Sequence, residues 1–514
     1  MTITPLATKP VRRSPTTRIV PHSPSRRAAP SPRRIASNFA WLSIAEVACR
    51  GTSVAVTLYL TRCLGPSGFG RIEFAFNVVF WLVLLVREGF DVIASREIAR
   101  HPRLVRPLVN HVLAVRGILA VSLFAILMTL GGLTLSRATD RTILSLYGVM
   151  LMTTAMGLDF VFRGLERMGL VALSLTIRTV VYAIGVGLCV SGPERVAWVP
   201  ALLITGEICG IALIWTCYAR RFGLPRPSLT GSRFLRVFLR RGRSVYLIQV
   251  SQAVIGSIDL LVVGLLSDWS EVGLYSAPHR MVTAVLTFGL IFQQVVFPSL
   301  ARSWRDTPAA GRKAMDALVR VLVLVLLPVA VGTSTLARPL VHYLFQVDYA
   351  DASLLLAMGV WRAPLLTMAF LYQTTLIALN REAAGVRLLL IGALGSGPLV
   401  AALRLGFGLP GAVAGLLLIG LALVAAGYGC LAREGRQPAW HHHLARPLAA
   451  SLLMVPVCLI LQRYHVLIAI VGGALTYFVA LTALGGLRLD DLLTIFGRPR
   501  TESNHHATPL RKAG

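Results

Sequence analysis

Acidic residues are scarce in this chain. Asp and Glu total 22 of 514 residues against 51 Lys and Arg, and charged residues of both signs make up only 14%. Hydrophobic residues make up 55%, and the mean hydropathy is +0.70. So little charge on so apolar a chain excludes a soluble globular protein and is typical of a protein with many membrane-spanning helices.

Paired cysteines and enzyme motifs are also missing from the sequence. The seven cysteines are scattered through apolar segments without paired spacing, which excludes a disulfide framework or a zinc site. The motifs GxxxxGK[ST], HExxH, G-x-S-x-G and D-x-D do not occur. His441–His443 form the one histidine cluster, beside Trp440 in a predicted cytoplasmic loop, and indicate a solvated interfacial stretch more than a metal site. We therefore predict a transporter without a cofactor, not an enzyme.

Apolar windows of about 20 residues recur along the chain, which is the length that a helix needs to cross a bilayer. They predict an all-α integral membrane protein with fourteen spans. The spans are 38–63, 70–95, 108–130, 142–162, 168–190, 196–219, 244–266, 278–301, 316–338, 353–377, 383–405, 410–431, 444–462 and 464–486.

The placement of arginine supports this count. If the basic N-terminus is cytoplasmic, every loop on that side is basic, and loop 220–243 alone holds eight arginines. The loops on the other side hold one or two arginines at most. Both termini are therefore predicted to be cytoplasmic, and the net charge of +29 records topology, so no nucleic-acid partner is expected.

A weak internal repeat divides the spans. PSGFGRIEFAFNV (66–78) aligns with WSEVGLYSAPHRM (269–281) at an offset of 203, with Gly70 on Gly273. Equivalent placement in two halves predicts two six-helix lobes related by an axis along the membrane normal. The predicted domains are a disordered basic tail (1–36), an N-lobe (37–219), a cytoplasmic linker (220–243), a C-lobe (244–432), a terminal helix pair (444–486) and a C-terminal tail (487–514).

Ionisable residues inside spans are candidate functional sites, because an Arg at mid-bilayer depth costs roughly 2.5–3.5 kcal/mol. Arg50 lies near the middle of the first span, four residues after Glu46. Arg87 and Glu88 reach a similar depth in the second span. We predict that these four line a cavity in the first lobe. The alternative is that they only neutralise one another and hold two helices together.

Five further in-span residues extend this set. Arg178 comes to the depth of Glu207, so the two can form a structural pair or line the cavity. Asp259 is the mid-membrane acid of the second lobe, and with Glu46 it is a candidate for H+ or Na+ coupling. Asp259, Arg280 and Arg362 are predicted to line the cavity as well, whereas Arg116 is interpreted as a snorkelling side chain. This weakly cationic interior fits an anionic substrate such as a diphosphate, which Arg binds bidentately.

Four motifs resemble one known family. They are YLTRCLGPSGFGRIEFAFNV (59–78), REGFDVIASREIAR (87–100), DFVFRGLER (159–167) and EVGLYSAPHRM (271–281). Together with the predicted topology they resemble the Wzx-type polysaccharide and O-antigen flippases of the multidrug/oligosaccharidyl-lipid/polysaccharide (MOP) exporter superfamily. The resemblance covers roughly residues 38–486 and implies a MATE-like fold of two six-helix lobes with an added helix pair.

This resemblance implies a function. Such a flippase exports an undecaprenyl-diphosphate-linked oligosaccharide across the bacterial inner membrane for surface polysaccharide synthesis. The head group would pass through a cationic cavity between the lobes while the lipid tail stays in the bilayer. Expected partners are the lipid-linked oligosaccharide, the bilayer, and a polysaccharide polymerase with its chain-length machinery.

Three alternatives stay open. A lipid II flippase is favoured by Arg50, fifteen residues before Gly65, but Val56 stands where that branch has a second arginine. A MATE-like multidrug cation antiporter would need an acid-dominated cavity, which this chain does not offer. An integral glycan-handling enzyme would need a sizeable outer loop, and every predicted outer loop is short.

Overall fold

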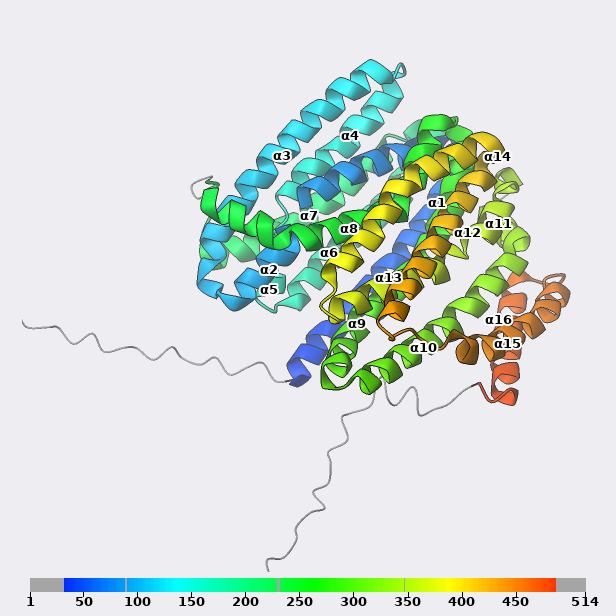
Figure 1. Cartoon of the computed structure of the whole chain (residues 1–514). Coiled ribbons are helices and arrows are strands. Elements are labelled where there is room, and N and C mark those ends of the chain that lie inside the picture. Colours follow the sequence, from blue (N-terminus) through cyan, green and yellow to red (C-terminus); the bar gives the residue numbers. More distant parts are fainter. Residues whose placement is uncertain (1–31, 88–89, 229–231, 346, 487–514) are drawn as a thin grey trace, which may run out of the picture.

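The structure is a computed structural model that describes residues 32–87, 90–228, 232–345 and 347–486, with side chains at most positions from residue 45 onward. This part of the chain contains helices and no strand, as predicted (Figure 1). The helices of the N-terminal half are α1 (Pro32–Arg87), α2 (Phe90–Arg100), α3 (Val105–Thr134), α4 (Ala138–Ala155), α5 (Asp159–Gly164), α6 (Met168–Cys189) and α7 (Trp198–Phe222). Those of the C-terminal half are α8 (Ser232–Leu266), α9 (Trp269–Asp306), α10 (Pro308–Thr335), α11 (Ala337–Phe345), α12 (Ala352–Gly359), α13 (Arg362–Ala378), α14 (Glu382–Arg433), α15 (Trp440–Leu461) and α16 (Val466–Ala483).

Eleven helical segments of the described chain are long and apolar enough to cross a membrane. Two of them, in α1 and α14, each consist of two helices joined at a glycine with positive φ: Gly65 (φ 64°) and Gly408 (φ 70°). Only glycine adopts this conformation without strain. When α1 and α14 are each counted as two helices, the eleven segments become thirteen. The 38-residue α9 is a further long helix, and with it the count agrees with the fourteen predicted spans.

The two halves of α1 run back toward each other. A straight helix would place Glu46 and Arg87 about 60 Å apart at 1.5 Å per residue, yet both line the same cavity. The predicted turn LGPSGFG is therefore real but very tight, since Gly65 is its only non-helical residue.

Two predicted spans are broken, and at equivalent places. Span 142–162 is interrupted before Asp159, where α5 begins, and span 353–377 is interrupted before Arg362, where α13 begins. These two residues lie 203 apart, the offset of the predicted repeat. Pro364 lies in the first turn of α13, where its missing N–H is tolerated. In the middle of an unbroken helix the same proline would remove a backbone hydrogen bond and clash with the preceding turn.

The repeat also appears as a direct contact between α1 and α9. A Cβ added at Gly70 would meet the carbonyl oxygen of Trp269 and lie 2.8 Å from the nitrogen of Gly273. A Cβ added at Gly273 would meet the carbonyl group of Pro66. Pro66 and Trp269 are themselves 203 residues apart, so the contact is reciprocal, as contacts across a two-fold axis are. Small residues permit this close approach of two helix backbones in a membrane.

The remaining packing sets the two halves around this contact. One apolar cluster joins α1, α4, α6 and α7 with α9, α11 and α12, and another fills the space between α8, α9, α10, α13 and α14. The terminal pair α15 and α16 packs on α10, where the hydroxyl of Tyr477 donates to the carbonyl of Leu324 at 2.7 Å (Figure 1). α8 begins at Ser232, inside the predicted linker 220–243. The lobe boundaries stay a prediction.

Candidate functional site

A cavity of about 760 Å³ in the N-terminal half gathers nine charged side chains. They come from both halves of α1, from α5, α6 and α7, and from α9 of the C-terminal half. The cations are Arg50, Arg87, Arg163, Arg178 and Arg280, and the acids are Glu46, Glu73, Asp159 and Glu207. Three of the four residues predicted on the hairpin, Glu46, Arg50 and Arg87, thus line one cavity; Glu88 lies outside the described residues.

Arg50 and Glu46 form the weakest of the ion pairs in this cavity. Their closest atoms, Nη2 and Oε1, are 3.8 Å apart, and the two side chains are 53% and 39% exposed. An exposed pair of this kind contributes about 0–1 kcal/mol. Glu46 therefore leaves the Arg50 guanidinium available to another anion.

Arg87, at the cavity wall, shares the carboxylate of Asp91 with a second arginine. Asp91 accepts from Arg87 Nε at 3.0 Å through Oδ2 and from Arg116 Nη2 at 2.6 Å through Oδ1. The Arg116 side chain is only 1% exposed and lies over the rings of Phe90 and Phe160. The interpretation of Arg116 as a snorkelling side chain is therefore wrong: an internal carboxylate and two aromatic faces hold it inside the protein.

Arg178 is neutralised by two acids. Its Nη2 donates to Asp159 Oδ2 at 3.0 Å and its Nη1 to Glu207 Oε2 at 3.1 Å. The predicted pair of Arg178 with Glu207 forms, and Asp159 at the start of α5 adds a second partner. This arrangement ties α5, α6 and α7 together behind the cavity.

Arg280 is the one cavity cation that comes from the C-terminal half. Its Nε and Nη2 donate to the two carboxylate oxygens of Glu73 at 2.9 and 2.8 Å. Its guanidinium also lies 5.1 Å from the centre of the Phe76 ring. Such a bidentate pair is stronger and more directional than a single contact.

Arg163 lines the same cavity and is exposed. It has no ion pair or side-chain hydrogen bond to any residue within the described ranges, in contrast to the other four arginines of the cavity. In the sequence it directly follows the predicted span 142–162 and belongs to a loop predicted to be cytoplasmic, so it was not among the predicted cavity residues. In the structure Arg163 lies at the predicted cytoplasmic end of the cavity and has no acidic partner among the described residues.

Asp259 and Arg362 do not line this cavity, contrary to the prediction. Asp259 is fully buried, and its Oδ2 accepts from Tyr275 Oη at 2.7 Å, His279 Nδ1 at 2.9 Å and Arg362 Nη1 at 3.3 Å. Arg362 also donates to the carbonyl of Gly256. Asp259 and Arg362 therefore belong to a buried ion cluster between α8, α9 and α13.

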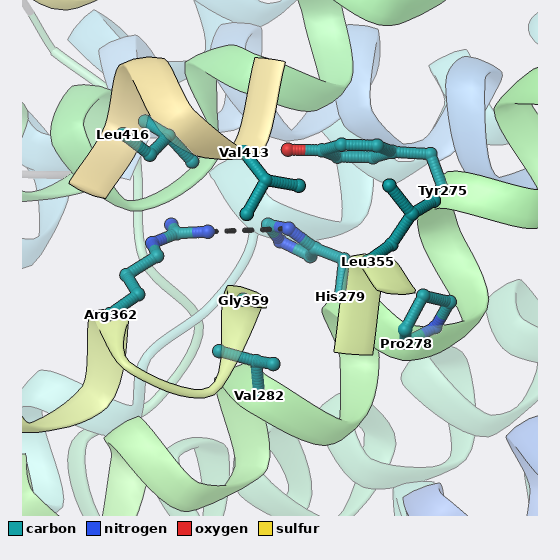
Figure 2. A pocket seen from close by; sticks show the side chains of 9 residues that line it. All are labelled: Tyr275, Pro278, His279, Val282, Leu355, Gly359, Arg362, Val413 and Leu416. Atoms are coloured by element: carbon teal, nitrogen blue, oxygen red, sulfur yellow. Dashed lines mark hydrogen bonds between the residues drawn. The ribbon is translucent and has the colours of Figure 1, made fainter. Parts of the chain in front are cut away.

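Figure 2 shows the space beside this cluster. His279 and Arg362 face each other across it, with 3.3 Å between Nδ1 and Nη1. The other walls are mostly apolar and come from α9, α12 and α14, among them Val282, Leu355 and Val413. The hollow measures about 20 Å³, which is room for a single water molecule. It cannot admit a head group.

The family of the chain follows from a sequence comparison. A family model described as "Polysaccharide biosynthesis protein" matches residues 35–304, which is more than half of the chain. The chain belongs to this family. No curated protein matches the sequence.

Solved structures agree on the fold of this member of the polysaccharide biosynthesis family. A structure titled "Lipid II flippase MurJ, inward closed conformation" superposes with a TM-score of 0.72 at 14% identity, over 86% of this chain and 98% of that one. An inward-facing MATE multidrug transporter of the MOP superfamily gives 0.61 at 15% identity, over 76% and 96%. A mutant of the Vibrio cholerae MATE transporter VcmN gives 0.53 at 15% identity, over 78% and 98%. The predicted MATE-like all-α fold is confirmed.

Sequence reasoning missed two acids of the cavity in this family member. Glu73 and Asp159 both lie inside predicted spans, so the rule that flags in-span charges applied to them equally. Glu73 lies only three residues into its predicted span and Asp159 lies near the end of another. At such positions a carboxylate is expected to lie at the membrane interface. The tight turn at Gly65 and the break before Asp159 move both residues to the cavity wall.

Proposed function

We propose that this protein is a flippase that moves a polyprenyl-diphosphate-linked oligosaccharide from the cytoplasmic to the outer leaflet of a bacterial inner membrane. The product would feed surface polysaccharide synthesis, which accords with the family to which the chain belongs. The names of the structural neighbours, a lipid II flippase and multidrug transporters, support a transport function.

One observation carries this proposal: the charged cavity offers guanidinium groups that an anion can take. Arg163 has no ionic partner in the described chain, and Arg50 is held by Glu46 at only 3.8 Å in an exposed pair. Arg binds phosphate bidentately, which suits the diphosphate that joins lipid to sugar. The volume of about 760 Å³ lies within the usual range of small-molecule sites.

A second hollow has the opposite chemistry. It measures about 600 Å³, lies between α10, α15 and α16, and is lined by apolar side chains such as Val325, Leu340 and Phe478. No charged residue lines it. It offers a surface to a hydrocarbon chain, so the sugar-diphosphate head group is assigned to the arginine cavity and not to this hollow.

The alternatives are less well supported by the cavity. Val56, which replaces an arginine expected of a lipid II flippase, lines the cavity wall, so the arginine set of that branch is incomplete here. A cation antiporter would present unpaired acids to its substrate. Here Glu73, Asp159 and Glu207 are already paired with arginines.

The double variant Arg50→Ala/Arg163→Ala tests the proposed function. Each lost charge-assisted contact to phosphate removes about 1.5–3 kcal/mol, so we expect cargo export to fall roughly tenfold to a hundredfold for each contact. The measurement is surface polysaccharide in a deletion strain that expresses the variant, with the amount of protein in the membrane determined in parallel.

Arg387→Ala is the matched control, because Arg387 is an exposed arginine of α14 whose side chain donates to the backbone of its own helix and, within the described residues, does not line the cavity. It should leave the polysaccharide unchanged. Normal polysaccharide from an equally abundant Arg50→Ala/Arg163→Ala variant would refute the role assigned to the cavity.

A further inference from the structure

The pair formed by Arg280 and Glu73 connects the two halves of the molecule. It joins residues 32–228 to residues 232–486, whereas the other ion pairs described above each lie within one half. Glu73 is only 7% exposed, whereas the Arg280 side chain is 35% exposed and faces the cavity. The pair is therefore open to cargo on its cationic side only.

This pair lies next to the reciprocal glycine contact. Glu73 follows Gly70 by three residues in α1, and Arg280 follows Gly273 by seven residues in α9, so each shares a helix face with its glycine. The backbones touch at the glycines, at the end of the spans predicted to face outward. The ion pair thus holds the halves together where the cavity is closed.

The ion pair occurs once, although the glycine contact is reciprocal. At the repeat offset of 203, Ser276 corresponds to Glu73, and Asn77 corresponds to Arg280. Ser276 donates to the backbone of its own helix, and Asn77 accepts from Trp81. Packing closes both sides of the contact, but of the two equivalent pairs of positions only the one that borders the cavity carries an ion pair.

We propose that the Arg280–Glu73 pair is a latch that the cargo diphosphate opens. This inference rests on the proposed function, because it takes the diphosphate as the competing anion. When a diphosphate takes the Arg280 guanidinium, Glu73 is left as a buried carboxylate without its cation, which destabilises the closed contact. Separation of α1 from α9 then exposes Glu73 to outer water and relieves that cost. Cargo binding would in this way favour the outward opening that releases it.

A thiol at Ser276 reports on the latch. Ser276 is fully buried on the face of α9 that carries Gly273 and Arg280, so Ser276→Cys reacts with a membrane-impermeant maleimide only when α1 and α9 separate. Ala277→Cys, at the next buried position, is a second reporter in case the first variant does not fold. The chain with native Ser276 gives the background from the seven native cysteines.

The first arm of the test uses no ligand. Glu73→Gln removes the charge from the latch, and we expect the labelling rate in spheroplasts to rise roughly tenfold or more. Arg71→Gln is the matched control: Arg71 is a neighbour of Glu73 in α1, but its partner Asp140, at 3.7 Å, belongs to the same half. It should leave the rate unchanged. A Glu73→Gln chain labelled as slowly as its parent would overturn the latch, whatever the cargo.

The second arm adds inorganic pyrophosphate to the purified full chain in nanodiscs. We expect it to raise labelling of the Ser276→Cys chain several-fold and to leave the already open Glu73→Gln chain unchanged. Calorimetry measures pyrophosphate binding separately. Pyrophosphate binding without faster labelling would overturn the latch. If Glu73→Gln is labelled fast but no pyrophosphate binds, the ion pair still closes the contact, and the diphosphate is refuted as the anion that opens it.

Discussion

Arg362→Ala is expected to destabilise the protein by about 3–5 kcal/mol, because it removes the guanidinium from the buried carboxylate of Asp259, which keeps its hydrogen bonds with Tyr275 and His279. Asp259 is 0% exposed and Arg362 only 4%, so water cannot replace the lost guanidinium. The variant also leaves the carbonyls of Ile255 and Gly256 without their side-chain donor. Thermal unfolding of the purified protein in detergent measures the loss as a lower midpoint.

The double variant Asp259→Leu/Arg362→Leu is the control for this expectation. Replacing both members of a buried pair by apolar residues is often neutral or stabilising, so the double variant should unfold at a higher midpoint than Arg362→Ala. If the two variants unfolded at the same temperature, the buried pair would not be the cause, and the loss would reflect disturbed packing around α13.

Gly273→Ala is expected to have the second large effect. The added Cβ would lie 2.6 Å from the carbonyl carbon of Pro66, and because the obstacle is backbone, no rotamer change relieves it. Overpacking of this kind typically costs about 1–3 kcal/mol, occasionally more. The halves must separate at this end, so the closed state is lost and surface polysaccharide should fall roughly tenfold or more.

Gly132→Ala is the matched control, since a Cβ at Gly132 in α3 meets nothing within 4 Å. It changes a glycine of an apolar helix by the same methyl group and should leave surface polysaccharide and the unfolding midpoint unchanged. Full export by an equally abundant Gly273→Ala variant would show that the glycine contact is not needed to close the outer end.

Much of the architecture could be predicted because it depends on patterns along the chain. Span length and loop arginines placed the crossings, and the motif around Gly65 placed the first turn. The repeat was weak in sequence, yet the reciprocal contact of Gly70 with Gly273 and the equivalent breaks before Asp159 and Arg362 follow the same offset. The alignment of one turn predicted two equivalent halves, and the structure adds that the aligned turns contact each other.

The distribution of charges between sites could not be predicted in the same way. Depth in a span tells how far a residue lies from the membrane surface, but not which neighbouring helix it faces. Asp259 and Arg50 both lie well inside their spans, yet one is buried in an ion cluster and the other is exposed in the cavity. Arg116 likewise depends on Asp91, a residue of another helix that its own sequence neighbourhood does not reveal.

Pro278 gives α9 a property that the contacts alone do not describe. Proline has no N–H, so the carbonyl four residues before it, that of Leu274, lacks its helical donor, and the helix bends there at low cost. Gly273 lies before Pro278 and Arg280 after it. A bend at this proline would therefore move the backbone contact and the ion pair by different amounts, so that the two closures open one after the other.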